Sequence, residues 1–464
     1  MPPFYRIANL LAQKPMGEEI KINGWVRTRR DSKGNFSFLE INDGSCLANL
    51  QVIADDSLSN YQTDILHLTT GCAVSISGIT VESPAKGQEI ELKATAINVE
   101  GLADPKTYPL QKKRHSFEFL RTITHLRPRT NSLGAVARIR SSLSFAAHQF
   151  FNQRGFVQIH TPILTTSDCE GAGEMFTATS LDLDHLPQAE GKTDYSQDFF
   201  GRRSGLTVSG QLEAEAYALA LGNVYTFGPT FRAENSNTSR HLAEFWMIEP
   251  EMAFCDLEGD IDVAEAFIKH LVRHVMEDCR EDFELFSHFI DKDLPARLEK
   301  TINHPFTRIT YTEAVERLTK SDRSFSFPIQ WGTDLQSEHE RYLCEEVFDG
   351  PLVVTDYPKE IKPFYMRAND DKKTVAAMDI LLPGIGEIIG GSQREERLDL
   401  LTDCMNKQGL NPNEYRWYLD LRRYGSAPHS GFGLGFERII QYVTGMANIR
   451  DVIAFPRTPG SAIV

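Results

Sequence analysis

Hydrophobic and polar residues alternate along residues 19–104 in short runs, among them "EIKINGWV", "LANLQVIA" and "QEIELKATAINV". A two-residue period places alternate side chains on opposite faces of a strand. Gly, Asn and Asp punctuate these runs, and several short strands separated by turn residues are typical of a small β-barrel. Residues 1–104 are therefore predicted to form an N-terminal barrel domain.

The pattern changes after residue 104. Residues 105–130 are rich in proline, lysine and arginine, show no clear period, and are predicted to form a hinge or connector. From Leu133 to Phe150 apolar residues recur at helical spacing behind a polar cap at Asn131. Gly155 ends this helix, and "FVQIHTPIL" after it is predicted to be a strand.

Residues 131–464 go on to alternate strands with helices, and many of the strands meet through hairpin-like turns. A doubly wound sheet would instead need a crossover between each pair of strands. The pattern predicts an α+β domain in which helices flank an antiparallel sheet. Within it, about residues 287–373 are expected to be an insertion, and they contain no motif that can be interpreted.

Composition indicates a soluble globular protein, with 41% hydrophobic and 24% charged residues in 464. No apolar run is long enough to span a bilayer, and the N-terminus lacks the features of a signal peptide. The seven cysteines are scattered without a CxxC pair, which favours a reducing cytoplasm over a disulfide framework. The net charge of −15 argues against non-specific nucleic-acid binding but leaves room for a local basic patch.

Ionisable residues gather in "TFRAENSNTSRHLAEFWMIEPEM", Thr230–Met252, which is predicted to be a hairpin with a polar loop. The two-residue period puts Arg232 and Glu234 on one face of the first strand. It puts an aromatic ring and two carboxylates in one row of the second strand, and the loop adds two further basic residues: Phe245, Glu249, Glu251, Arg240 and His241. Ion pairs without a function usually lie singly at a rim, so a whole face of them predicts a binding floor.

Two glycine-rich stretches accompany the hairpin. In "HSGFGLGFERIIQYVTG" glycines alternate along a strand, which suits either a flat ligand lying on bare backbone or a tight packing contact. The spacing matches neither the dinucleotide fingerprint nor the phosphate loop of nucleotide-binding proteins. In "GIGEIIGGSQRE", Glu387 and Ser392 offer oxygen atoms that suit Mg²⁺ together with a substrate phosphate, although a surface turn would look the same.

In the predicted barrel, Arg29 and Arg30 precede Phe36 and Phe38, which share one strand face. Exposed aromatic rings beside basic residues suit stacking on unpaired bases with the phosphates held nearby. The alternative, left open by these residues alone, is that both phenylalanines belong to the barrel core and the arginines are merely solvated.

Three of these stretches, in order, resemble the class II aminoacyl-tRNA synthetases. "GFVQIHTPIL", with Pro162, is similar to the family's first motif, "FRAE…RH…EF" to its second and "GFGLGFER" to its third. The barrel and the "LRPRT" connector resemble the subgroup that charges tRNAs with aspartate, asparagine or lysine, and the chain is most similar to its bacterial asparaginyl enzymes. The resemblance covers essentially the whole chain. It implies an anticodon-reading OB fold, a catalytic domain built on an antiparallel sheet, and a homodimer.

The resemblance also implies roles for individual residues. Arg232 would contact the ATP α-phosphate as the catalytic residue, and Phe245 and Arg438 would sandwich adenine. For ATP it implies Arg232, Glu234, Arg240, His241, Phe245, Glu387, Gly435 and Arg438. For the amino acid it implies Glu170, Gln211, Glu249, Glu251 and Arg394. For the tRNA anticodon it implies Arg29, Arg30, Phe36, Phe38 and Gln51. For Mg²⁺ it implies Glu387 and Ser392, and for the dimer interface Pro162.

The amino acid expected from the resemblance is L-asparagine. Ala214 stands where aspartyl enzymes carry a lysine that binds the substrate carboxylate, and Glu249 stands where they carry Asp. A carboxylate there would accept from a side-chain amide and repel aspartate, since like charges in a dry site oppose each other. Glu251 is on the same row and could take this role instead.

The expected activity is therefore activation of asparagine with ATP, followed by its transfer to tRNA-Asn. The first alternative is an aspartyl enzyme of relaxed tRNA specificity. A second is an ATP-dependent amide synthetase relative, which would have no use for an anticodon barrel. A third is a non-enzymatic RNA-binding or regulatory paralogue, which the intact motif residues disfavour.

Overall fold

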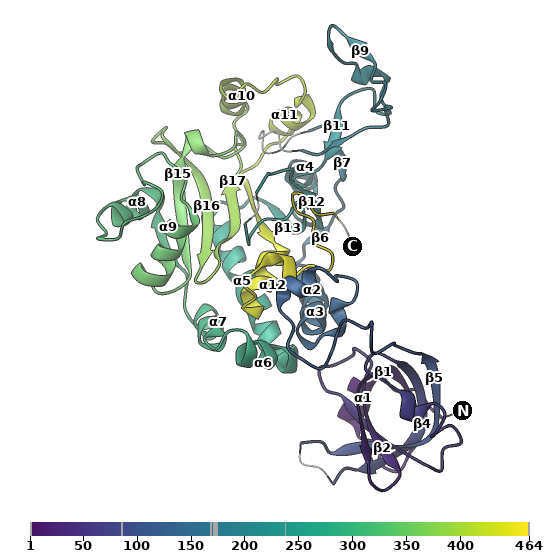
Figure 1. Ribbon diagram of the computed structural model, residues 1–464. Coiled ribbons are helices and arrows are strands. Elements are labelled where there is room, and N and C mark those ends of the chain that lie inside the picture. Colours follow the sequence, from purple (N-terminus) through teal and green to yellow (C-terminus); the bar gives the residue numbers. More distant parts are fainter. Residues whose placement is uncertain (1, 85–86, 168, 170–174, 237, 463–464) are drawn as a thin grey trace. The chain divides into compact units, whose positions relative to one another are not determined.

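The computed structural model describes the chain except for residues 1, 85–86, 168, 170–174, 237 and 463–464. Two compact units, residues 1–138 and 139–464, make up the molecule (Figure 1). The division falls within helix α3 (Asn131–Gln153). Among the described residues, no helix combines the length and the apolar character that crossing a bilayer requires.

The first unit contains a closed five-stranded barrel with the strand order β1-β2-β3-β5-β4. Its strands are β1 (Glu19–Ser32), β2 (Phe36–Asn42), β3 (Leu50–Asp55), β4 (Ala73–Glu82) and β5 (Ile90–Gly101). The long strand β1 pairs with β4 through its first half and with β2 through its second half, and its register shifts between Val26 and Thr28. Its other elements are the short helices α1 (Ile7–Gln13), η1 (Ile65–His67), α2 (Phe117–Arg121) and η2 (Arg127–Arg129). The predicted barrel is confirmed.

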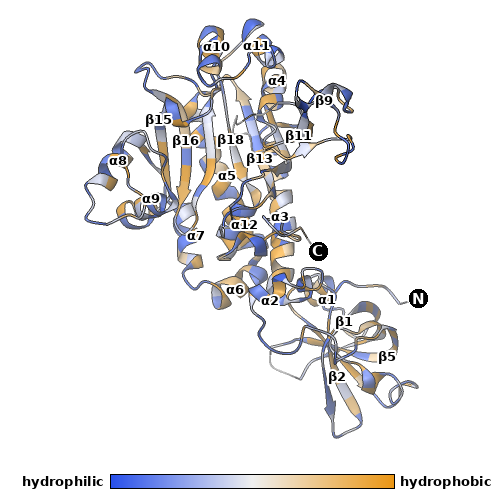
Figure 2. Ribbon diagram, turned by 45° about the horizontal axis from the view of Figure 1, so that its top comes forward, coloured by the Kyte–Doolittle hydropathy of each residue, from blue (hydrophilic) through white to orange (hydrophobic). Residues whose placement is uncertain are grey.

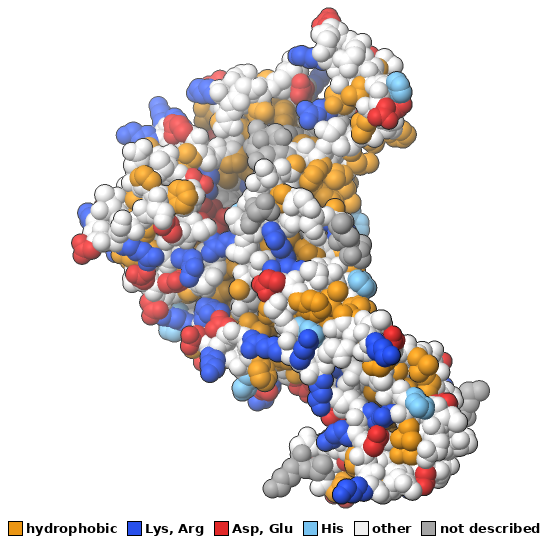
Figure 3. Space-filling model, in the orientation of Figure 1, with side chains coloured by type: hydrophobic (Ala, Val, Ile, Leu, Met, Phe, Trp, Pro, Cys, Tyr) orange, Lys and Arg blue, Asp and Glu red, His pale blue; other side chains and the backbone are white. Residues whose placement is uncertain are grey.

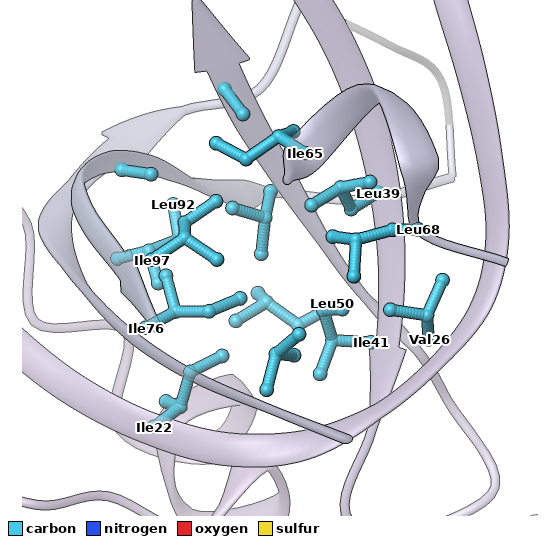
Figure 4. Packing of buried hydrophobic residues seen from close by; sticks show 14 of the residues in the cluster. Ile22, Val26, Leu39, Ile41, Leu50, Ile65, Leu68, Ile76, Leu92 and Ile97 are labelled. Carbon is cyan, nitrogen blue, oxygen red and sulfur yellow. The ribbon is translucent and has the colours of Figure 1, made fainter. Parts of the chain in front are cut away.

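Alternation along each strand fills the barrel. In β2 the buried residues are Ser37, Leu39 and Ile41, while the residues between them remain partly exposed. Figure 4 shows aliphatic side chains from all five strands and from η1 converging on the interior. Phe36 and Phe38 point away from this core, so the alternative in which they belong to it is wrong.

The second unit is built on an eight-stranded sheet with the order β14-β15-β16-β17-β18-β13-β12-β6. Its strands are β6 (Val157–Gln158), β12 (Asn223–Phe231), β13 (Glu244–Ala253), β14 (Thr307–Thr310), β15 (Leu352–Pro358), β16 (Thr374–Leu382), β17 (Gly386–Gln393) and β18 (His429–Gly435). Neighbouring strands are antiparallel except for the outermost pair at each end, β14–β15 and β12–β6. The predicted antiparallel sheet is thus confirmed.

The strand predicted over "FVQIHTPIL" is much shorter than expected. Only Val157 and Gln158 join the large sheet, and Leu164 and Thr165 join a separate small one. Pro162 lies between them and has no N–H to donate to a strand ladder, which accounts for the break. The small sheets consist of β7 (Leu164–Thr165), β8 (Thr177–Ala178) and β11 (Ser204–Leu206), and of β9 (Gln188–Ala189) and β10 (Lys192–Thr193), with η3 (Tyr195–Gln197) between them.

Helices cover the sheet. Helix α5 (Leu257–Asp278) packs against β16, β17 and β18, and α4 (Gln211–Leu221) packs against β12 and β13. Figure 2 shows many hydrophobic residues along the strands, and the buried residues of α5 are mostly apolar, among them Ile261, Phe267 and Leu271. The remaining helices are α6 (Arg280–Phe289), α7 (Leu294–Asn303), α8 (Tyr311–Thr319), α9 (Ser337–Tyr342), η4 (Leu343–Val347), η5 (Lys359–Ile361), α10 (Leu398–Lys407), α11 (Arg416–Arg423), α12 (Phe436–Thr444) and η6 (Ile449–Asp451).

Candidate active site

The hairpin β12–β13 and the glycine strand β18 lie side by side in the sheet. Strand β13 pairs with β12 on one edge and with β18 on the other, where Glu251 is opposite Gly431 and Met247 is opposite Gly435. The ring of Phe432 in β18 lies 6.4 Å from that of Phe267 in α5. Because side chains alternate across a strand, the glycines of β18 belong to the opposite face, away from α5.

Glycine is present at two positions of β18 for different physical reasons. A Cβ at Gly431 would lie 2.3 Å from the carbonyl oxygen of Pro250 and 2.5 Å from the Glu251 carboxyl carbon. A Cβ at Gly433 would lie 2.6 Å from the Met247 methyl group and no closer than 3.9 Å to its next neighbour, Glu249. Gly431 is therefore required by the close approach of a neighbouring strand, whereas Gly433 borders open space that a ligand can occupy.

The first cavity on this face, here named the arginine cavity, brings together every residue predicted to contact ATP. Its lining includes Arg232, Glu234, Arg240, His241, Phe245, Glu387, Gly435 and Arg438. They come from the hairpin and its loop, from β17, and from the junction of β18 with α12. Residues that are far apart in the chain thus share one concave surface.

Within the arginine cavity, opposite charges and an aromatic ring lie close together. The Arg232 guanidinium lies 5.4 Å from the centre of the Phe245 ring and 4.0 Å from a Glu234 oxygen. Arg438 donates to the carbonyl of Glu387 at 3.0 Å. Burial lowers the pKa of the His241 imidazole, although Glu234 opposes this. The lining thus sets the guanidinium groups of Arg232, Arg240 and Arg438 among the carboxylates of Glu234, Glu387 and Glu437.

The second cavity, the carboxylate cavity, shares Arg232, Met247, Glu387 and Gly433 with the first. It also contains most of the residues predicted to bind the amino acid: Gln211, Glu249, Glu251 and Arg394. The two cavities therefore adjoin, with these residues between them or along their common edge. Two substrates could therefore meet at Arg232.

The two candidate glutamates of β13 have different partners. The Glu249 carboxylate accepts from the Ser209 hydroxyl, from the Gly210 N–H at 3.1 Å and from the Thr226 hydroxyl at 3.2 Å. Glu251 is fully buried, and both its oxygens accept from Arg394. Burial raises the pKa of Glu251 to about 7 against the effect of Arg394. Both glutamates line the cavity, but Glu251 is committed to holding Arg394, whereas Glu249 is held by the neutral donors Ser209, Gly210 and Thr226.

A network of buried side chains supports Arg394 from behind, and sequence reasoning missed it. Glu215 of α4 accepts from Arg422 at 2.7 Å, from Tyr418 at 2.8 Å and from His429, whose Nε2 is 3.0 Å away. Burial alone would raise the pKa of Glu215, but Arg422, His429 and Arg394 together lower it. Glu215 ends the stretch "SGQLEAE", residues 209–215, and a charged residue on the buried side of a helix was the available signal.

Acidic residues also converge near Glu387. Asp379 of β16 lines the carboxylate cavity with Glu387, and Lys362 donates to it at 2.9 Å. Burial and then Glu387 raise the pKa of Asp379 against the effect of Lys362. Burial and Glu387 also raise the pKa of Glu340, on α9, to about 7. A single acid within the apolar run "VAAMDILL" was the signal for Asp379.

Ser392 does not lie in the lining of either cavity. Its hydroxyl is fully buried and accepts from Arg394 at 2.9 Å. Ser392 thus contacts Arg394, and the carboxylate that lines the carboxylate cavity together with Glu387 is that of Asp379. Glu170 lies outside the described residues. Pro162 is exposed, next to the exposed apolar side chains of Ile163 and Leu164.

On the barrel, four of the five predicted anticodon residues share the outer face of β1, β2 and β3. Arg30 lies opposite Phe38, donates to Gln51 at 3.3 Å, and has its guanidinium 5.9 Å from the Phe38 ring. The Phe36 and Phe38 rings meet edge to face at 5.1 Å. Arg29 instead pairs across the ladder with the core residue Leu39 and donates to the Ile65 carbonyl, so it is not part of this group.

Comparison with known proteins identifies both units. Residues 117–459 match the family described as tRNA synthetases class II (D, K and N), and residues 20–100 match the OB-fold nucleic acid binding domain. The chain is 63% identical to the asparagine–tRNA ligase of Desulfotalea psychrophila, over 98% of this chain and 99% of that protein. It is 62% identical to that of Nostoc sp., with the same coverage.

Solved structures agree in fold. The asparaginyl-tRNA synthetase of Pyrococcus horikoshii, complexed with asparaginyl-adenylate, superposes with a TM-score of 0.84 at 33% identity, covering 97% of each chain. That of Entamoeba histolytica, also in complex with asparaginyl-adenylate, has a TM-score of 0.84 at 25% identity over both full chains. With an OB-fold barrel, a matching catalytic sheet and full-length relatives, this chain belongs to the class II aminoacyl-tRNA synthetases, in the group of aspartyl, lysyl and asparaginyl enzymes.

Proposed function

We propose that this protein is an asparagine–tRNA ligase, which activates L-asparagine with ATP and transfers it to tRNA-Asn. The observation that carries the proposal is that the arginine cavity and the carboxylate cavity adjoin and both are lined by Arg232. One cavity has the cations and aromatic ring that suit a nucleoside triphosphate, and the other has the polar groups that suit a small amino acid.

In the arginine cavity, adenine stacks between the Phe245 ring and the Arg438 guanidinium, a contact that suits arginine. Glu234 accepts from the adenine amine. Arg232 contacts the α-phosphate, and the distal phosphates meet Arg240 and His241. Because His241 has a lowered pKa, Arg240 is the stronger charge for the γ-phosphate.

Magnesium suits the carboxylates of Glu387 and Asp379. Mg²⁺ binds oxygen ligands and usually takes one or two carboxylates together with substrate phosphates. Two acids that face one cavity form a donor set of that kind, and burial followed by the charge of Glu387 raises the pKa of Asp379. When bound, the metal would neutralise charge on the phosphates. Ser392, the other predicted ligand, would act through Arg394.

In the carboxylate cavity, Glu249 accepts a hydrogen bond from the NH₂ group of the asparagine side chain, and Arg394 donates one to the oxygen of the same side chain. Gln211, together with Glu170, would hold the α-ammonium group. Aspartate would bring a second carboxylate toward Glu249, which a poorly hydrated site disfavours by roughly 3–4 kcal/mol. That penalty corresponds to a preference for asparagine of several hundredfold.

The reaction needs no side-chain nucleophile. The asparagine carboxylate attacks the α-phosphorus, a new P–O bond forms, and the bond to the pyrophosphate oxygen breaks. The terminal ribose hydroxyl of tRNA next attacks the adenylate carbonyl carbon, forming the ester and releasing AMP. Arg232 stabilises the charge that develops on the α-phosphate, so positioning and charge neutralisation supply the rate enhancement.

Three further assignments belong to this proposal. The barrel face with Arg30, Phe36, Phe38 and Gln51 reads the anticodon, with residues 105–130 as a hinge to the catalytic domain. The exposed residues around Pro162 contribute to a homodimer interface. The enzyme acts in the cytoplasm.

The test is amino-acid-dependent ATP–pyrophosphate exchange, run with asparagine and with aspartate, each with and without tRNA. We expect exchange with asparagine only, and its loss in Arg232→Ala with the circular dichroism spectrum unchanged. Comparable exchange with aspartate would favour the aspartyl alternative. Near-normal exchange in Arg232→Ala would remove the role assigned to this arginine.

A further inference from the structure

Helix α9 belongs to the part of the chain whose sequence could not be interpreted, and it lies against β16 and β17 at the distal end of the arginine cavity. Its Ser337 hydroxyl accepts from Arg240 Nη1 at 2.8 Å. Its Glu340 places an oxygen 3.9 Å from the same nitrogen, and the side chain is only 13% exposed. Two residues of α9 therefore contact the same nitrogen of Arg240, Ser337 by a hydrogen bond and Glu340 by an ion pair.

Glu340 also reaches the strand that carries Glu387. Its Oε2 accepts from the backbone N–H of Glu387 at 3.2 Å. A Cβ at Gly386 would lie 2.4 Å from that oxygen, so the backbone turn into β17 is shaped to admit the carboxylate. One carboxylate therefore connects a loop arginine to a strand residue, both of which line the arginine cavity.

We propose that Glu340 is a positioning residue for the triphosphate of ATP: with Ser337 it fixes Arg240 where the β- and γ-phosphates arrive, and it holds β17 at Glu387. The inference rests on the proposed function, because Arg240 needs a polyphosphate to meet. A charged partner restricts a long arginine side chain before the ligand binds, so less conformational entropy is lost on binding.

A purely structural role for Glu340 leads to a different expectation. If the carboxylate only braced the fold, its loss would weaken every ligand of the site together and lower the melting temperature. If it positions Arg240, its loss weakens ligands that carry β- and γ-phosphates and spares those that do not. ATP and AMP differ in these two phosphates alone.

The experiment uses Glu340→Gln and is run at pH 8, where a carboxyl whose pKa burial and Glu387 raise to about 7 is ionised. The substitution keeps an oxygen for the Glu387 N–H and removes the charge facing Arg240. In asparagine-dependent exchange we expect KM for ATP to rise about tenfold, the equivalent of ~1.4 kcal/mol. KM for asparagine, the inhibition constant of AMP and the melting temperature should stay near those of the wild type. Glu346→Gln, the same substitution at an exposed residue paired with Arg323, is the matched control and should change nothing.

A double-variant cycle with Arg240→Ala tests whether Glu340 acts through that arginine. In the Arg240→Ala background, Glu340→Gln should add no further increase in KM for ATP. If Glu340→Gln is poorly folded, Ser337→Ala should still raise KM for ATP selectively. Equal weakening of ATP and AMP, or no change in either, would overturn the inference. Absence of asparagine-dependent exchange in the wild type would contradict the proposed function instead.

Discussion

In the proposed function, the single carboxylate of Glu249 discriminates between asparagine and aspartate. Ser209, Gly210 and Thr226 hold its two oxygens, so it cannot swing away from an incoming side chain. Glu249→Gln removes the negative charge and presents an amide of nearly the same shape. We expect kcat/KM for asparagine to fall roughly 30- to 100-fold, because a charge-assisted hydrogen bond is lost in a buried site.

The same substitution should reduce the exclusion of aspartate, so the aspartate-to-asparagine ratio of kcat/KM rises. Pyrophosphate exchange with both amino acids measures this ratio. Glu251→Gln is the informative comparison, since Glu251 is occupied by Arg394 and its loss should weaken both amino acids. If this ratio is unchanged in Glu249→Gln but changes in Glu251→Gln, then Glu251 is the residue that discriminates between the two amino acids.

Glu215 tests the buried network behind Arg394. Its pKa is lowered below the ordinary value of 4.5 by Arg422, His429 and Arg394. A carboxyl with a lowered pKa contributes stability above its unfolded pKa and loses it as the pH falls through the folded pKa. Glu215→Gln should therefore lower the free energy of unfolding by roughly 3–5 kcal/mol at neutral pH, because buried cations lose their partner.

The pH dependence separates charge from packing. Between about pH 5 and 3 the wild type should lose stability more steeply than Glu215→Gln, by up to ~1.4 kcal/mol per pH unit. Urea denaturation across this range measures the difference. Glu360→Gln, at an exposed site, should keep the wild-type slope. Parallel slopes for Glu215→Gln would mean that Glu215 carries no charge in the folded protein.

At the scale of elements, the glycine strand β18 combines packing with ligand binding. Gly431→Ala places a methyl group against the backbone of β13 and should destabilise the sheet and abolish exchange together. Gly433→Ala meets only a flexible Met247 side chain. Its methyl group also narrows the region shared by both cavities, so we expect near-normal stability with a raised KM for ATP. Melting temperatures and exchange kinetics for the pair test this division, and equal destabilisation would contradict it.

The local sequence pattern predicted which side chains share one face of a strand, but not which strands and helices lie beside that strand. The two-residue period placed Phe245, Glu249 and Glu251 on one face, which the cavities bear out. It could not show that β18, about 180 residues further along the chain, pairs with β13, because such pairing depends on tertiary packing. Asp379 and Glu340 entered the site in the same way, from strands and helices with no local signal of proximity.

The two-residue period alone also does not decide which face of a strand is buried. Phe36 and Phe38 were predicted to share a side of β2, and the apolar rings favoured the core. The structure buries Ser37 instead, whose hydroxyl is satisfied by Asp31 and by Tyr61. Leu39 and Ile41 face the barrel core, so Phe36 and Phe38 lie on the outer face of β2, where a base could stack on their rings.

At the scale of the molecule, the acidic net charge must be reconciled with tRNA. The chain has 64 acidic and 49 basic residues, and on the face that Figure 3 shows the two kinds intermingle. Residues 111–130 depart from this average, with six Lys and Arg against one Glu. Lys112, Lys113 and Arg114 there are exposed. A short basic stretch on an acidic body suits phosphate contacts at defined places rather than general adhesion to RNA.

Salt dependence distinguishes these phosphate contacts from stacking. Each lost phosphate contact removes about 0.7–0.9 from the slope of log affinity against log salt. Replacing Lys112, Lys113 and Arg114 with Ala should raise KM for tRNA at low salt and reduce the magnitude of this slope by about 2.

Phe38→Ala should raise KM for tRNA with the slope unchanged, because a stacked ring releases no counterions. Both variants should keep normal pyrophosphate exchange, since that half-reaction takes place in the second unit. An unchanged slope in the triple variant would mean that this stretch does not contact phosphates, and impaired exchange in Phe38→Ala would mean that the ring supports the fold.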